Sequence, residues 1–269
     1  MSIIHRLVHL NSIKRFSVHQ VLSILISPFY SSNILRQPFS TLLHATSGKP
    51  GSEVNCHFGV KNIHTNLANL VPSLSCMDAS DDSTFSTLSS DMLIYENFID
   101  EEEERDLFNE IEPYVKKLRY EYDHWDNAIH GYRETERRNW TKKNKRIIQR
   151  IRDLAFPPEV AQLAYVHILD LHEDGHIKPH VDSVKFCGDT IAGVSLLSSS
   201  VMGLVHEKDE TKWAKFLLGR RSLYIMKGTA RYDYKHEVYG GDKSVFKNRP
   251  IPRDRRISVI CRNEVAKYS

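Results

Sequence analysis

Two histidines and one aspartate in the second half of the chain have the types and spacing of a metal site. His180 and Asp182 are separated by one residue, and His236 follows later in the sequence. Two imidazoles and one carboxylate on one side of an octahedron form the ligand set of non-haem Fe(II) centres, and this set leaves coordination positions open. The three side chains therefore predict an iron site at which further molecules can bind.

Two arginines near the C-terminus indicate what binds beside that metal. In a strand, Arg256 and Arg262 point to the same face, together with Ser258 and Ile260. A cation on the inner side of an otherwise apolar strand needs an anion, and the planar guanidinium group suits a carboxylate. With the metal ligands, the arginines predict an iron- and 2-oxoglutarate-dependent dioxygenase. Arg255 would point to the opposite face, so we expect its replacement by lysine to leave the 2-oxoglutarate requirement unchanged.

Period-two patterns indicate how the three metal ligands meet. His180 and Asp182 share one face if residues 178–183 are extended. Residues 231–238 alternate between charged side chains and a second set that includes His236, which predicts a strand. The side chains predicted to point inward from that strand are Tyr232, Tyr234, His236 and Val238.

A second His-x-Asp pair competes for this interpretation. The chain has 14 histidines, so about one such pair is expected by chance, and His124 with Asp126 forms another. The segment around His124 lacks an apolar strand pattern, whereas His180 lies between the apolar runs 164–171 and 191–197. We therefore favour His180 as the ligand, and a histidine of the core or surface without a metal is the alternative.

Three segments resemble the AlkB family of dioxygenases. They read IKPHVDSVKFCGDTIAGVSLL, SLYIMKGTARYDYKHEV and RRISVICR, and the upstream stretch RYEYDHWDNAIHGYRETE resembles a mitochondrial branch of that family. The resemblance extends over residues 93–264. It implies that His180, Asp182 and His236 bind the iron.

The resemblance also implies a cosubstrate site. Arg256 and Arg262 match the arginines that bind 2-oxoglutarate, and Tyr224 matches a tyrosine that contacts it. Ser258, on the same predicted face as the arginines, is a further candidate contact. The implied reaction consumes 2-oxoglutarate and O2 and releases succinate and CO2. It hydroxylates a C–H bond, or removes an N-methyl group as formaldehyde.

One departure from the family concerns that cosubstrate. Many AlkB enzymes carry Asn and Tyr where this chain has Leu169 and Leu171. Two polar contacts are thus expected to be missing.

Composition is that of a soluble globular protein. Hydrophobic residues make up 41% of the chain and charged residues 26%, and 269 residues suffice for one or two domains. No run of 18 apolar residues exists, so we expect no membrane span. The four cysteines lack a paired spacing, which favours a reduced compartment. We expect a monomer.

The first 52 residues differ in charge from the rest. They contain five of the 37 basic residues and none of the 34 acidic ones, so the remaining chain has a net charge of 32 − 34 = −2. Basic, serine-rich and acid-free segments are typical of mitochondrial transit peptides. We therefore predict import into the mitochondrial matrix, with a secretory signal or a disordered tail as alternatives.

The order of patterns predicts the architecture. Residues 53–90 are predicted to be a flexible linker, because 80–90 are rich in Ser and Thr, and 91–265 to form the dioxygenase domain. Asp100 is expected to cap a helix, and residues 142–155 to form a second one. Short strands follow. We predict a mainly β fold with flanking helices (α+β), specifically a double-stranded β-helix (jelly roll) with N-terminal supporting helices.

The sequence offers three candidate functions for the domain. Residues 133–152 hold nine basic residues and two acids, among the aromatic residues Tyr120, Tyr122, Trp125, Tyr132 and Trp140. Such a run binds RNA in some proteins and is a solvated helix face in more. The resemblance to the mitochondrial branch implies protein hydroxylation without a nucleotide-recognition lid, linked to programmed necrosis. Demethylation of N-methylated bases in mitochondrial tRNA is the second candidate, and a non-catalytic interaction module is the third.

Overall fold

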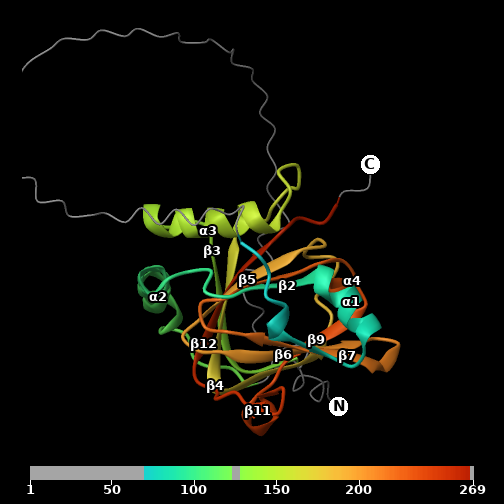
Figure 1. The fold of residues 1–269 in the computed structure, drawn as a ribbon. Coiled ribbons are helices and arrows are strands. Elements are labelled where there is room, and N and C mark those ends of the chain that lie inside the picture. Colours follow the sequence, from blue (N-terminus) through green and yellow to red (C-terminus); the bar gives the residue numbers. More distant parts are fainter. Residues whose placement is uncertain (1–69, 123–127, 267–269) are drawn as a thin grey trace, which may run out of the picture. The chain divides into compact units, whose positions relative to one another are not determined.

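A computed structural model of the chain describes residues 70–122 and 128–266 (Figure 1). The predicted transit peptide, the first part of the predicted linker and the competing pair of His124 and Asp126 lie outside the described residues. None of the described helices is long and apolar enough to cross a membrane.

Antiparallel strands dominate the described part of the chain, and ten of them form one sheet. They are β1 (Met77–Ala79), β2 (Met92–Tyr95), β3 (Ile129–Arg137), β4 (Val166–His180), β5 (Ile191–Leu196), β6 (Ser200–His206), β7 (Asp209–Leu218), β8 (Leu223–Met226), β9 (Tyr234–Val238) and β12 (Arg256–Arg262). A separate hairpin consists of β10 (Val245–Phe246) and β11 (Arg249–Pro250).

The long strand β4 belongs to two layers of this sheet. Its first half pairs with β12, with Leu171 opposite Arg256, and its last residues pair with β9, with His180 opposite His236. The pairings continue as β4-β12-β5-β8 on one side and β4-β9-β6-β7 on the other. Two four-stranded antiparallel layers that share a bent strand form a double-stranded β-helix, so the predicted fold class is confirmed.

Glycine allows the chain to pass closely at this bend. A Cβ atom on Gly175 would lie 2.6 Å from the carbonyl oxygen of Gly131 in β3 and 2.9 Å from that of His172. Both neighbours are backbone atoms that cannot move aside without disturbing the sheet.

Helices α2 (Glu101–Val115) and α3 (Lys142–Ala155) cover the outer face of the β12 layer. Asp100 begins α2 with a capping box. The Asp100 carboxylate accepts from the Glu103 amide, and the Glu103 carboxylate accepts from the Asp100 amide. Both predicted helices are confirmed, and α3 has the predicted bounds. The remaining helices are α1 (Asp82–Asp91), α4 (Gly228–Tyr232), η2 (Leu74–Cys76) and η3 (Gly241–Lys243).

The segment predicted as the end of a linker is structured instead. Residues 82–91 form α1, whose cap Asp81 accepts from the amide of Thr84 at 2.9 Å and from its hydroxyl at 2.7 Å. Leu88 of α1 is fully buried, and β1 before the helix pairs with β7. The serine and threonine content predicts flexibility there, but a capped helix with a buried apolar side chain accommodates these residues.

The predicted strand 231–238 is shorter than expected. Only Tyr234–Val238 forms β9, and there Tyr234, His236 and Val238 are buried as predicted. Tyr232 instead ends α4 and is 41% exposed, which contradicts its inward placement. The N-terminus of α4 is fixed by Asp91, whose carboxylate accepts from the amide of Thr229 at 2.8 Å, and this local helix overrides the alternating pattern.

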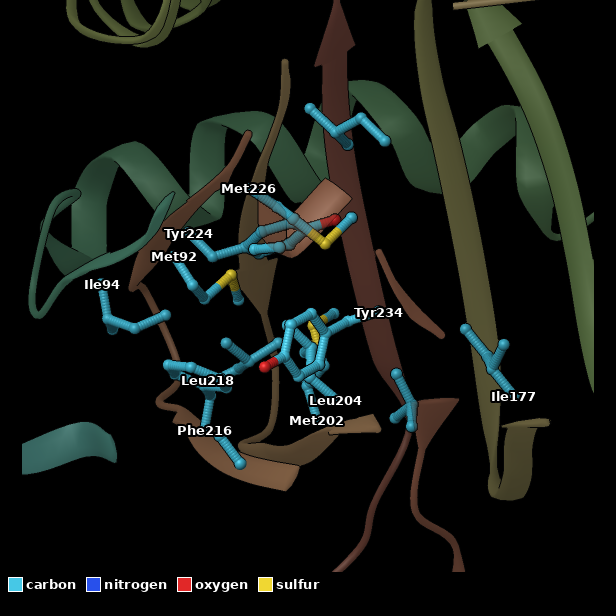
Figure 2. Close-up of a cluster of buried hydrophobic side chains, with 14 of the residues drawn as sticks. Met92, Ile94, Ile177, Met202, Leu204, Phe216, Leu218, Tyr224, Met226 and Tyr234 are labelled. Carbon is cyan, nitrogen blue, oxygen red and sulfur yellow. The ribbon is translucent and has the colours of Figure 1, made fainter. Parts of the chain in front are cut away.

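Side chains between the two layers form an inner core, part of which Figure 2 shows. Tyr224 and Met226 from β8 and Tyr234 from β9 belong to it. A second core lies between the β12 layer and helices α2 and α3, and it contains Ile257 and Val259. The strands of the β12 layer therefore have one face toward the interior and one toward the helices.

A buried carboxylate of β4 is the centre of an ion-pair network on the outer face of the sheet, next to helix α2. Asp170 of β4 is fully buried and accepts from Arg133 at 2.7 Å and from Arg255 at 2.8 and 3.0 Å. Arg255 also contacts Glu112 of α2 at 2.5 Å. Arg255 points away from the interior as predicted, and a lysine in its place could not make these paired contacts.

We expect Asp170→Asn to lower the free energy of unfolding by about 3–5 kcal/mol, because it leaves two arginines without their shared carboxylate. The measurement is urea unfolding. The control is Glu102→Gln, which removes an exposed partner 3.5 Å from Lys143 and should cost less than about 1 kcal/mol. Equal losses in the two variants would contradict the importance of this network.

Candidate active site

The predicted metal ligands come together at the end of β4. The ligand atoms of His180, Asp182 and His236 all lie within 4.8 Å of one another. Asp182 Oδ1 is 3.3 Å from His180 Nε2 and 3.8 Å from His236 Nε2. The two histidines are direct neighbours across β4 and β9, which brings their rings to 4.3 Å between centroids. The group can hold one metal ion.

The charges of these groups suit a divalent cation. Burial opposes the ionisation of Asp182, but the hydrogen bond with His180 and the positive charges nearby, including that of Arg262, hold its pKa well below the usual range. Burial lowers the pKa of His236 to about 4, against the opposing effect of Asp182. At neutral pH the carboxylate is ionised and the imidazole is neutral, which are the forms that bind metals.

The inner face of β12 carries the predicted arginines. Ile257, Val259 and Cys261 pack against the helices, whereas Ile260 packs in the interior. Arg256 and Arg262 are separated from Ile260 by an even number of positions and therefore share its face of the strand. The predicted inner face of β12 is thus confirmed. Arg262 Nη2 lies 3.6 Å from Asp182 Oδ2, which places this guanidinium beside the metal ligands.

Arg256 is a buried cation without a carboxylate partner among the described residues. It is 2% exposed, its Nη2 donates to the Ser195 hydroxyl at 2.8 Å, and its Nε has no hydrogen-bond partner. Burial lowers the pKa of this guanidinium to about 10. An uncompensated charge in the interior is costly, so the site fits a bound anion.

Tyr224 lies between the two arginines along the strand direction. It pairs with Gly193, which pairs with Ile260 of β12. A Cβ atom on Gly193 would lie 2.4 Å from the Tyr224 ring, so glycine makes room for the phenol. Burial raises the pKa of Tyr224, and both Arg256 and Asp182 act on it electrostatically.

The two leucines that replace polar residues of the family face the same interior. Leu169 lies opposite Ser258 and Leu171 opposite Arg256, and both leucines pack in the inner core. The wall beside Arg256 is thus apolar, as the sequence predicts.

Sequence reasoning missed two polar residues near the site. Ser195 is fully buried and positions Arg256, and its polar side chain in an apolar strand was the available signal. Arg231 was predicted on the charged face of a strand but is fully buried, with its Nη2 3.4 Å from Cys187 Sγ. Its charge contributes to the lowered pKa of His236, after burial and the nearer His180. No signal in the sequence separated Arg231 from an exposed arginine.

Comparison with known proteins decides the family. The model of the 2OG-Fe(II) oxygenase superfamily matches residues 91–262, which contain all of these groups. This chain belongs to the 2OG-Fe(II) oxygenase superfamily. It therefore uses Fe(II), 2-oxoglutarate and O2, and it is a dioxygenase.

Relatives narrow the family further. The Mus musculus protein named alpha-ketoglutarate-dependent dioxygenase alkB homolog 7, mitochondrial, is 51% identical over 68% of this chain and 83% of its own length. The Bos taurus protein of the same name is 51% identical over 66% of this chain and 80% of its own. This oxygenase is thus an AlkB-like, mitochondrial dioxygenase, as its resemblance and N-terminal composition predicted.

Solved structures align more distantly. OsALKBH1 aligns with a TM-score of 0.48 at 14% identity, over 64% of this oxygenase and 97% of that chain. A Pseudomonas putida prolyl-4-hydroxylase aligns with a TM-score of 0.47 at 10% identity, over 69% and 98%.

The geometry of the metal-binding group predicts the effect of removing one ligand. His236→Ala should abolish tight binding of Mn(II), used as an oxygen-stable substitute for Fe(II), because two protein ligands rarely hold such an ion. Electron paramagnetic resonance of Mn(II) titrations measures this. His124→Ala should leave binding unchanged, and a loss at His124 with retention at His236 would assign the metal to the other pair.

Proposed function

We propose that His180, Asp182 and His236 bind the Fe(II) of this dioxygenase. Two imidazoles and one carboxylate would leave coordination positions of the ion open for the cosubstrate. When bound, iron and 2-oxoglutarate supply the oxidising power, drawn from O2, that converts a substrate C–H bond to C–OH. The strands β4 and β9 hold the two histidines, and Asp182 follows two residues after the end of β4.

We further propose that Tyr224, Ser258, Arg256 and Arg262 hold 2-oxoglutarate. Arg262, beside Asp182, is placed for the carboxylate next to the metal. Arg256, at the other end of β12, is placed for the far carboxylate. The observation that carries this proposal is the buried charge of Arg256, which has no carboxylate partner among the described residues, on the strand that also carries Arg262 beside Asp182.

Arg256→Lys tests the cosubstrate site. The required concentration of 2-oxoglutarate should rise about tenfold or more, equivalent to about 1.4 kcal/mol, because lysine cannot make a planar two-point contact with a carboxylate. Succinate formation measures the change, and Mn(II) affinity should stay the same. The matched control is Arg255→Lys on the outer face, which should lower stability without changing the 2-oxoglutarate requirement. Equal increases in both variants would refute the assignment.

For the substrate, we propose that this monomeric enzyme of the mitochondrial matrix hydroxylates a protein and thereby acts in programmed necrosis. The position of the basic run 133–152 supports a protein substrate rather than an RNA substrate. Helix α3, which carries most of its cations, packs on the outer face of the β12 layer, whereas the metal-binding group is associated with the inner face.

Many of the cations in that run are also occupied. Arg137 pairs with Glu110 at 2.9 Å, and Arg150 pairs with Glu103 at 2.7 Å. The aromatic neighbours are engaged as well, because Arg137 stacks on the rings of Tyr114 and Trp140. These groups stabilise the helices and are not available to track a phosphate backbone.

The loop after Asp182 presents apolar side chains instead. Val184 is 53% and Phe186 is 72% exposed, within four residues of the metal-binding aspartate. Apolar and aromatic side chains are typical anchors of protein contacts. The surface beside the site is therefore suited to a polypeptide.

Mass spectrometry of mitochondrial proteins tests this proposal. Cells with the wild-type enzyme should contain a protein that carries one added oxygen, and cells with His180→Ala should lack that modification and show an altered necrotic response to damage. Gel shifts with mitochondrial tRNA at several salt concentrations provide the opposing test. Tight, steeply salt-dependent binding with base demethylation would replace protein by RNA as the substrate.

A further inference from the structure

A second arginine lies near Arg256 at the start of β12. Arg253 belongs to the segment between β11 and β12, and its Nη2 donates to the carbonyl oxygen of Gly175 at 3.1 Å. Its Nε and Nη1 atoms are buried and have no hydrogen-bond partner among the described residues. A carbonyl oxygen does not neutralise a guanidinium, so the charge of Arg253 is uncompensated there.

The two guanidinium groups repel each other. Burial lowers the pKa of Arg253, and it also lowers the pKa of Arg256, to which the charge of Arg253 contributes further. Neither arginine forms an ion pair with a carboxylate within residues 70–122 and 128–266. Arg256 is buried and Arg253 is half-buried, and two like charges in such surroundings raise the free energy of the fold unless an anion binds between or beside them.

Contacts with β4 place the two arginines at neighbouring levels of that strand. Leu171 lies opposite Arg256, and Gly175, whose carbonyl oxygen accepts from the half-buried Arg253, follows four residues later. The walls at this level are the apolar side chains of Leu169 and Leu171. Charge from a second arginine would therefore replace the polar contacts that these leucines do not make.

We infer that Arg253 and Arg256 act together on the far carboxylate of 2-oxoglutarate, so that Arg253 is a further specificity-determining residue for dicarboxylates. The inference rests on the proposed cosubstrate site. Arg253 should therefore increase the affinity for 2-oxoglutarate through its far carboxylate. It should not affect the affinity for a 2-oxo acid that has only one carboxylate.

The test compares two 2-oxo acids on Mn(II)-loaded full-length protein by calorimetry. Arg253→Met should raise the dissociation constant of 2-oxoglutarate about tenfold or more, and it should leave that of 2-oxobutyrate, which lacks the far carboxylate, unchanged. Arg253→Lys, which keeps the charge and disturbs the fold least, should recover part of the affinity. The matched control is Arg249→Met, an exposed arginine in the neighbouring hairpin, which should change neither constant.

The outcomes separate this inference from the proposed site. Unchanged 2-oxoglutarate binding in Arg253→Met, with weakened binding in Arg256→Met, would overturn the role of Arg253 alone. Unchanged binding in both variants would overturn the cosubstrate site itself. Equal weakening of both 2-oxo acids in Arg253→Met would show a structural effect and also reject the inference. If the Met variant does not fold, the same comparison with Arg253→Lys decides, since a loss is expected only for 2-oxoglutarate.

Discussion

The bend of β4 is the constraint on which the rest of the site depends. Every backbone amide and carbonyl of a buried strand needs a partner, and β4 finds its partners in β12 along one half and in β9 along the other. One continuous strand thus connects the layer that carries the arginines with the layer that carries His236. Gly175 makes the close passage at the bend sterically feasible.

Charge balance explains the chemistry of the interior. The metal-binding group contributes one carboxylate, and Arg256 and Arg262 add two fixed positive charges on the inner face of β12. A divalent metal adds two more, and a dianionic cosubstrate offsets part of this excess. In the proposed site the cosubstrate neutralises these cations, so the same buried charge that lowers the stability of the fold would favour a dicarboxylate.

On the outer face of the sheet, carboxylates of the protein itself neutralise the arginine charge. Asp170 and Glu112 compensate Arg255 within the protein, and this network fastens α2 to the sheet. Neighbouring arginines, 255 and 256, therefore have different roles because successive side chains in a strand face opposite sides. Arg255 stabilises the fold, and Arg256 is the proposed partner of the cosubstrate.

Strand parity explains why much of the site could be predicted from the sequence. The alternation in β9 and β12 and the His-x-Asp spacing are local patterns, and they placed His236, Arg256 and Arg262 correctly. The helix at 82–91 and the burial of Arg231 could not be predicted in this way. Both depend on tertiary contacts, with β1 joining β7 and α4 held by Asp91, and composition does not report such contacts.

A crystal structure with Mn(II) and the inert analogue N-oxalylglycine tests the central claim most directly. The account predicts one metal ion bound by His180, Asp182 and His236, with the far carboxylate of the analogue in a two-point contact with Arg256. A metal ion at another site, or an analogue whose far carboxylate lies away from Arg256, would contradict it.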